Sequence, residues 1–218
     1  MKLRLLSIAI SCLLFSSTGF ADIVGDSGND GGVIPDNSSS GYVSTVTITD
    51  SEIIQNATFS IEGLTHSWIG DLTITVAHST SGKTATLLHR VGMTSSPSST
   101  GDSSDVNGTY MFQDGNGSIW SEAALGDSSY VVRPGVYSAS GMNEAIVSLD
   151  SIFSGELTNG DWSFTISDNN ATQIGSFVQT SVEFGSVAVP EPGSMTIVVA
   201  GILVGGFGFR HRRPRSLS

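Results

Sequence analysis

Acidic and amide side chains near the expected ends of strands are the residues of this 218-residue chain best suited to chemistry. A bound calcium ion takes about six to eight oxygen ligands, which Asp, Asn and backbone carbonyl groups in loops usually supply. Five residues have the right type and position for such a site: Asp71, Asp114, Asn116, Asp161 and Asp168. The same side chains can instead close turns by accepting hydrogen bonds from nearby backbone N–H groups. Calcium is therefore the cofactor that these residue types suggest, with turn capping as the alternative.

A serine-protease centre requires Ser, His and Asp side chains that act together. The central part of the chain contains His66, His78 and His89, but neither a Gly-x-Ser-x-Gly turn nor the serine context typical of subtilisin relatives. We therefore expect no catalytic residue. His66 is interpreted as a packing or edge residue, His78 as lying at the rim of its strand, and His89 as facing solvent.

Pairs of carboxylates are the remaining catalytic candidates, because glycosidases place two Asp or Glu residues on either side of the bond that they break. Asp161 with Asp168, or Glu156 with Asp161, could form such a pair. The sequence does not fix the distance between them. A hydrolase is therefore the least favoured of three functional hypotheses.

The charges of the chain are unevenly distributed. All twenty acidic residues lie between Asp22 and Glu191, where only Lys83, Arg90 and Arg133 are basic. This formal excess of seventeen negative charges argues against nucleic acid as a partner, because phosphates need a basic surface. It also argues against binding to anionic lipid surfaces. It fits a well-solvated acidic surface, calcium binding, or both.

Short stretches of alternating apolar and polar residues indicate one all-β domain between Tyr42 and Phe184. A period of two residues buries one face of a strand. The residues expected to point inward are Val46 and Ile48, then Ala57, Phe59 and Ile61, then Leu72, Ile74 and Val76, and finally Trp162, Phe164 and Ile166. Because Gly, Ser and Asn turns separate these stretches, the pattern predicts a jelly-roll-like β-sandwich.

Two long segments of the domain lack this alternation, residues 93–105 and 115–142. They are predicted to be loops, with brief strands near residues 110–112 and 130–132.

Two further expectations concern the edges of the domain. Phe177 and Val182 have opposite parity, so burial of both requires a bend or bulge between them. Residues 22–41 are rich in Gly, Asp, Asn and Ser, and this composition predicts a flexible linker before the domain.

The first 21 residues have the three parts of a secretory signal peptide. Lys2 and Arg4 are positive, residues 5–15 are apolar, and small residues precede a predicted cut after Ala21. Cys12 is the only cysteine and lies inside the apolar run. The exported chain is therefore expected to have neither a thiol nor a disulfide.

The other end of the chain, residues 185–218, also has three parts. Pro190, Glu191 and Pro192 form a stiff, extended segment, an apolar run follows at residues 195–209, and an arginine-rich segment comes last. The run is short for a membrane span, and the arginines would stay on the cytoplasmic side. This order resembles the PEP-CTERM sorting signal. The resemblance implies that an exosortase-type enzyme processes the Pro-Glu-Pro motif, and that a single transmembrane helix holds the chain until then.

Three stretches of the domain resemble the P/Homo B domain that follows the catalytic domain of subtilisin-like proprotein convertases. They are a Gly-Asp-Leu strand start within residues 66–88, Gly-Asp-Trp-Ser-Phe-Thr-Ile-Ser-Asp at residues 160–168, and a closing Gly-Ser-Phe strand within residues 175–182. The resemblance implies a P/Homo B-like sandwich over residues 42–184. It also implies that any proteolysis belongs to a separate subtilisin-like serine endopeptidase.

The sequence thus predicts a protein exported across the inner membrane to the cell envelope, the outer surface or the medium, the last after C-terminal processing. The leading functional hypothesis is a non-catalytic β-sandwich module that binds or organises extracellular polysaccharide or matrix. The second hypothesis is an accessory domain that works with a separate secreted protease.

Overall fold

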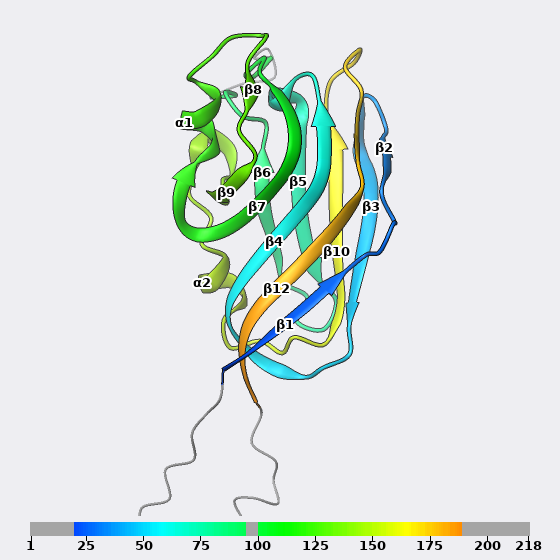
Figure 1. The fold of residues 1–218 in the computed structure, drawn as a ribbon, viewed down its shortest axis with the longest axis vertical. Coiled ribbons are helices and arrows are strands. Elements are labelled where there is room, and N and C mark those ends of the chain that lie inside the picture. Colours follow the sequence, from blue (N-terminus) through cyan, green and yellow to red (C-terminus); the bar gives the residue numbers. More distant parts are fainter. Residues whose placement is uncertain (1–19, 95–99, 189–218) are drawn as a thin grey trace, which may run out of the picture.

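The computed structural model describes residues 20–94 and 100–188 and consists of two β-sheets packed face to face (Figure 1). Among these residues, the larger sheet has eight strands in the order β1-β12-β4-β11-β2, with β7 beside β4 and the short β8 and β9 beside β7. The smaller sheet has four strands in the order β3-β10-β5-β6. The all-β sandwich expected from the sequence is thus confirmed.

The strands of the larger sheet are β1 (Phe20–Asp26), β2 (Gly32–Ile34), β4 (Glu52–His66), β7 (Asp105–Ser118), β8 (Val131–Val132), β9 (Gly135–Ser138), β11 (Gly175–Phe177) and β12 (Gln179–Ala188). Those of the smaller sheet are β3 (Ser38–Ile48), β5 (Leu72–His78), β6 (Thr84–His89) and β10 (Gly160–Asp168). The short helical elements are η1 (Ile69–Asp71), α1 (Ile119–Ala123), η2 (Met142–Glu144) and α2 (Leu149–Phe153).

Aromatic side chains from both sheets fill the space between them. Phe59 on β4 lies 5.6 Å from Trp162 and 6.0 Å from Phe164, both on β10, between ring centroids. Trp162 also contacts Phe184 on β12, with ring centroids 4.6 Å apart. Edge-to-face and tilted pairs of this kind add about 0.5–1.5 kcal/mol each beyond the burial of apolar area. The inward residues predicted for the four alternating stretches are all buried.

The predicted irregularity between Phe177 and Val182 is also confirmed. Both side chains are buried, and β11 ends at Phe177 before β12 begins at Gln179. Val178, between the two strands, is 54% exposed. The facing residue on β4 is Gly63, with φ +61°, and a Cβ atom there would lie 2.5 Å from Cγ2 of Val178. The glycine therefore leaves room for Val178, at the point where the parity of the buried residues changes between β11 and β12.

The prediction of a flexible linker at residues 22–41 is wrong. This segment contains most of β1, all of β2 and the start of β3. β1 pairs with β12 along its whole length, from Phe20 opposite Val187 to Asp26 opposite Ser181. Edge strands are held mainly by backbone hydrogen bonds and need few apolar side chains. A strand of polar composition therefore shows no alternating pattern in the sequence.

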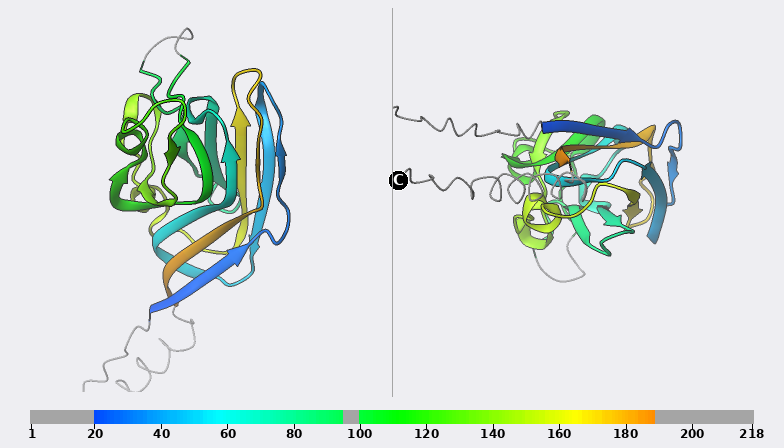
Figure 2. Two further views of the ribbon diagram at one scale, coloured as in Figure 1. Left: turned by 45° about the horizontal axis from the view of Figure 1, so that its top comes forward. Right: turned by 90° about the horizontal axis from the view of Figure 1, so that it is seen from below.

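The prediction of a long loop at residues 115–142 is wrong for most of this segment, whereas the brief strands expected near residues 110–112 and 130–132 are present within β7 and as β8. β7 continues to Ser118, and α1, β8 and β9 follow before η2. Ser118 is the N-cap residue of α1, and its hydroxyl accepts hydrogen bonds from the backbone N–H groups of Trp120 and Ser121. These elements are too short to show a period in the sequence, and β8 and β9 pair in parallel with β7. Figure 2 shows that this region lies on the opposite side of the molecule from β2 and β3.

Several predictions fall wholly or partly outside the described residues. The signal peptide ahead of β1, the Pro190–Pro192 motif and the apolar run at 195–209 belong to this group. The predicted cut after Ala21 falls within β1, where Ala21 pairs with Ser186, and it would leave residues 22–26 of β1 in the sheet. Along residues 20–94 and 100–188, no helix is both long enough and apolar enough to cross a membrane.

Candidate functional site

Two of the five predicted calcium ligands meet at one end of the sandwich. We call the group formed by Asp71, Asp168, His66 and Arg90 the buried carboxylate cluster. The Asp168 carboxylate lies at the end of β10, where Oδ2 is 3.1 Å from Nε2 of His66 on β4. The same carboxylate accepts a hydrogen bond from the backbone N–H of Asn170 at 3.1 Å. Because β4 and β10 belong to different sheets, the His66–Asp168 contact ties the two sheets together.

The hydrogen bonds of His66 define where its proton lies. Its Nδ1 accepts a hydrogen bond from the backbone N–H of Trp68 at 3.1 Å. A ring nitrogen that accepts carries no proton, so the proton of a neutral imidazole lies on Nε2 and is donated to Asp168. His66 is thus a packing residue, as the sequence predicts, with a hydrogen-bonding role between the sheets.

Asp71, in η1, is the less satisfied of the two carboxylates. It is fully buried, and neither carboxylate oxygen has a hydrogen-bond partner at normal distance. The nearest cation is Nη2 of Arg90, 3.9 Å from Oδ1, and Nε of Arg90 donates instead to the Gly70 carbonyl at 3.0 Å. Burial first, and then the neighbouring Asp168 carboxylate, raise the pKa of Asp71, while His66, Arg90 and the Asn170 amide partly offset this.

The other three predicted calcium ligands lie elsewhere. Asp114, in β7, accepts hydrogen bonds from the Leu149 N–H at 2.8 Å and the Ser148 hydroxyl at 2.6 Å, both at the start of α2. Asn116 donates its amide to the Gln113 carbonyl within the same strand. Capping therefore describes Asp114 better than calcium binding does.

Asp161 lies at the start of β10 and accepts a hydrogen bond from the Thr47 hydroxyl at 2.7 Å. The five residues therefore do not form one site. Within the part of the chain that the structure describes, no group of three or more His, Cys, Asp or Glu side chains is placed to hold a metal ion. Calcium at Asp71 and Asp168, with oxygens from other groups, stays a prediction.

Of the two carboxylate pairs considered for a glycosidase, Asp161 with Asp168 does not fit the fold. Asp161 and Asp168 lie seven residues apart on the same strand, and a strand rises about 3.3 Å per residue, so they are separated by roughly 23 Å. Catalytic carboxylate pairs lie about 5–10 Å apart. Glu156 is engaged with Nζ of Lys83 at 2.7 Å.

The remaining histidines are structural. The prediction that His78 lies at the rim is wrong, because it is buried and stacks on Trp162 with ring centroids 4.0 Å apart. Its Nε2 lies 3.0 Å from the Asn159 carbonyl, and burial lowers the pKa of this imidazole. His89 is half-buried rather than facing solvent, and burial, followed by the nearby Arg90, lowers its pKa.

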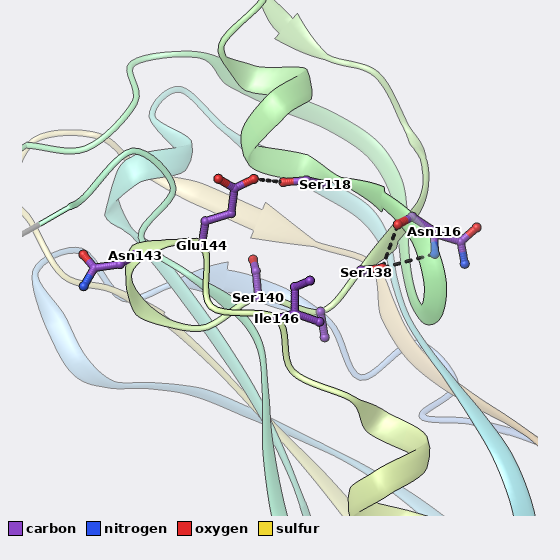
Figure 3. Close-up of a pocket in the computed structure, with 8 residues that line it drawn as sticks. Asn116, Ser118, Ser138, Ser140, Asn143, Glu144 and Ile146 are labelled. Atoms are coloured by element: carbon purple, nitrogen blue, oxygen red, sulfur yellow. Dashed lines mark hydrogen bonds between the residues drawn. The ribbon is translucent and has the colours of Figure 1, made fainter.

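A separate pocket of about 250 Å³ lies between the C-terminal part of β7, the end of β9 and η2 (Figure 3). We call it the polar pocket. Its lining is Asn116, Ser118, Ser138, Ala139, Ser140, Asn143, Glu144 and Ile146. Six of the eight lining residues thus carry a hydroxyl, amide or carboxylate group, while Ala139, Ile146 and the carbon atoms of the polar side chains supply most of the exposed lining.

Hydrogen bonds hold the walls of the polar pocket in place. Figure 3 shows Glu144 reaching toward Ser118, whose hydroxyl donates to Oε1 at 2.5 Å. On the far wall, the Ser138 hydroxyl donates to the Asn116 carbonyl at 2.8 Å and accepts from the Asn116 N–H at 3.1 Å. At the base, Nε1 of the buried Trp120 donates to the Ser140 hydroxyl at 3.1 Å. The pocket is therefore preformed.

The backbone beside the polar pocket is strained. Asn143 and Glu144 both have left-handed backbone angles, with φ +57° and +60°. Asn adopts this region with little penalty, but for Glu it costs on the order of 1 kcal/mol. The turn is closed by the Gly141 N–H, which donates to the Ala145 carbonyl at 2.8 Å. The strained turn places the Glu144 carboxylate at the mouth of the pocket.

Sequence reasoning found only one residue of the polar pocket, Asn116, and assigned it to calcium. Ser118, Ser140 and Glu144 lie in or beside a stretch that was predicted to be a loop. Their residue types are common and their spacing is irregular, so nothing in the sequence singles them out.

All three basic side chains of the described residues lie beside carboxylates. Lys83 pairs with Glu156, Arg133 donates from Nε to Glu122 at 2.7 Å, and Arg90 lies beside Asp71. None of the three lines the polar pocket. The described surface thus offers no cation free of a carboxylate.

Comparison with known proteins identifies one part of the chain. The family model of the PEP-CTERM protein-sorting motif matches residues 188–213. The chain therefore carries the sorting signal expected from its C-terminal residues, which marks it for export and for sorting to the envelope by an exosortase. No curated protein matches the chain.

Solved structures with a similar arrangement include two of a serine protease of Aeromonas sobria. One is the complex of that protease with its chaperone, at 15% identity and a TM-score of 0.45 over 78% of this chain. The other is the protease itself, at 14% identity and a TM-score of 0.43 over 77% of this chain. This chain spans 28% and 27% of those chains. The resemblance to the P/Homo B domain stays a prediction.

Proposed function

We propose that this protein is an exported, exosortase-sorted β-sandwich module that binds neutral extracellular polysaccharide without catalysing a reaction on it. The observation that supports this most directly is the polar pocket, whose lining combines hydroxyl, amide and carboxylate groups with apolar surface. Sugar hydroxyls both donate and accept hydrogen bonds, and side chains of Ser, Asn and Glu match both roles. The sorting signal supports a location where polysaccharide is present.

The ligand is expected to be neutral because of the charges around it. An anionic chain of uronate or sulfate groups needs cations, whereas each basic side chain of the described residues already lies beside a carboxylate. The exported part has seventeen more acidic than basic residues, which would repel such a ligand. A neutral glycan avoids this repulsion and needs only hydrogen bonds and apolar contact.

The composition of the polar pocket supports binding rather than hydrolysis. Glu144 is the one carboxylate among the residues that line it. Glycosidases require a pair of carboxyl groups across the scissile bond. A single carboxylate bonded to the Ser118 hydroxyl can orient a sugar hydroxyl, but it has no second carboxyl group to act with.

The test is a binding screen with the full chain in a sugar-free detergent such as lauryldimethylamine oxide. The probes are neutral glucans, galactans and mannans, with alginate as the anionic comparison. Glu144→Gln and Ser140→Ala should weaken binding of the preferred neutral glycan about tenfold, equivalent to roughly 1.4 kcal/mol. Glu183→Gln, an exposed substitution on β12, is the matched control and should leave binding unchanged.

Two results would contradict the proposal. One is tighter binding of alginate than of every neutral glycan. The other is binding of a neutral glycan that neither pocket substitution weakens. Because neutral hydrogen bonding is not screened by ions, binding of the preferred glycan should also persist when sodium chloride is raised to about 0.5 M.

A further inference from the structure

A second pocket lies at the end of the sandwich where η1 and the β10–β11 loop come together. Its volume is about 220 Å³. We call it the Trp68 pocket, and its lining is Trp68, Thr100, Asn170, Ala171, Thr172 and Gln173. It shares no residue with the polar pocket. The lining thus combines one indole ring with amide and hydroxyl side chains and the methyl group of Ala171.

The indole ring of Trp68 is fixed in place. Its Nε1 donates a hydrogen bond to the Thr100 carbonyl at 2.8 Å, and its backbone N–H donates to Nδ1 of His66 at 3.1 Å. The side chain is only half-buried, so part of the ring stays accessible in the pocket. An aromatic ring held in this way binds a ligand at a low cost in conformational entropy.

The opposite wall, the loop from Asn170 to Gln173, is also held in a specific shape. The Asn170 N–H donates to Asp168 of the buried carboxylate cluster, and the Thr172 N–H donates to the Asp36 carboxylate at 3.2 Å. Thr172 has φ +94°, a region that a β-branched residue rarely adopts. Strain of this kind persists only where the surrounding structure enforces it, and it is concentrated at binding sites.

We propose that the Trp68 pocket is a second carbohydrate subsite, which takes one neutral sugar ring stacked on the indole. This inference rests on the proposed function and extends it. A sugar ring has an apolar face of C–H groups that packs on an aromatic ring, and a rim of hydroxyls that bonds to amide and hydroxyl side chains. No charged side chain lines the pocket, so the ligand is again neutral. The volume lies below the roughly 300–1,000 Å³ of pockets for drug-sized ligands, which suits a single ring.

Two separate subsites give the protein a way to organise polysaccharide as well as to bind it. A module that holds sugar at both pockets joins two chains, or two segments of one chain, and the second contact strengthens the first through effective concentration. The polar pocket alone would allow binding without bridging.

The experiment measures bridging and binding separately with the full chain in a sugar-free detergent. Beads coated with dextran report bridging through turbidity, and cellohexaose in calorimetry reports binding at single sites. Trp68→Ala should abolish the turbidity and reduce the number of cellohexaose sites from two to one. Trp68→Phe keeps an aromatic ring and should retain both readouts in weakened form. Gln173→Ala should weaken the second site, whereas Gln55→Ala, an exposed substitution on β4, is the matched control.

The outcomes separate the two proposals. If wild type binds at one site, and Glu144→Gln removes that site while Trp68→Ala does not, the second subsite is refuted and the polar pocket stands. If only Trp68→Ala removes binding, the polar pocket is refuted and the Trp68 pocket stands. If wild type binds neither of these probes and none of the galactans and mannans of the screen above, both proposals are refuted. A thermal melt of Trp68→Ala close to that of wild type excludes unfolding as the cause of a loss.

Discussion

The buried carboxylate cluster and the polar pocket use the same types of side chain for opposite purposes. In the cluster, the carboxylates of Asp71 and Asp168 are buried, and that of Asp168 connects strands of the two sheets through His66. In the pocket, Glu144 is exposed and is held at the mouth by a strained turn. Burial separates the two roles. The buried Asp168 carboxylate serves the fold, while the exposed Glu144 carboxylate is the one that we propose for a ligand.

The largest effect is expected from breaking the cluster at Asp168. Asp168→Ala leaves Nε2–H of His66 and the Asn170 N–H without their acceptor. An unsatisfied buried donor costs about 1–3 kcal/mol, so the free energy of unfolding should fall by about 2–4 kcal/mol in urea denaturation. Asp161→Ala, at the exposed end of the same strand, is the control and should cost less than about 1 kcal/mol. Equal losses in the two variants would show that the cluster does not hold the sheets together.

The next largest effect is a rise in Tm caused by calcium. Measuring it tests whether the buried carboxylate cluster has only a structural role. A ligand present at about one hundred times its Kd stabilises a protein by about 2.7 kcal/mol. If Asp71 and Asp168 bind calcium, millimolar calcium should raise the Tm of wild type by several degrees over that in EDTA. Asp71→Asn should remove the increase, whereas Asp114→Asn should keep it, because Asp114 caps α2. An unchanged Tm of wild type would show that Asp71 and Asp168 do not bind calcium.

The sequence predicted the regular part of the fold well because alternation in long strands is a property of neighbouring residues. The inward faces of β4, β5 and β10 could be assigned residue by residue. β1 and β2 do not show a pattern in the sequence because an edge strand is held by its backbone, and among their described side chains, residues 22–26 and 32–34, only Ile23 and Ile34 are buried.

The sites depend on contacts that no local pattern encodes. His66 meets Asp168 across 102 residues of sequence, and Ser118 meets Glu144 across 26. Asp71 and Asp168 could be selected by residue type and position at strand ends, but their lack of exposure could not. Neither left-handed position of the turn, Asn143 or Glu144, is a glycine that would have marked its backbone angles in the sequence.

A smaller effect, with a definite sign, concerns the dependence of stability on pH in EDTA. Burial raises the folded-state pKa of Asp71 above the unfolded value of 3.8. The folded protein therefore holds this proton more tightly than the unfolded chain. The resulting stabilisation is complete below pH 3.8 and is lost as the pH rises through the folded-state pKa.

Asp71→Asn cannot titrate at this position. The free energy of unfolding of wild type, measured relative to that of Asp71→Asn in urea denaturation, should therefore fall as the pH rises from 3.8 through the folded-state pKa of Asp71. A difference that stays constant, or that grows with pH, would mean that Arg90 compensates the Asp71 carboxylate fully despite the distance of 3.9 Å.

The smallest expected effect concerns the polar pocket and comes from the backbone strain at Glu144. Glu144→Gly and Glu144→Ala both remove the pocket carboxylate, but only glycine adopts φ +60° without strain. The Gly variant should therefore be about 1 kcal/mol more stable than the Ala variant in urea denaturation. At Glu183, in the regular strand β12, the order should reverse, because glycine weakens a strand interior. Both Glu144 variants should bind glycan equally poorly. If the Ala variant is as stable as the Gly variant, the turn stores no strain and the exposed position of Glu144 needs another cause.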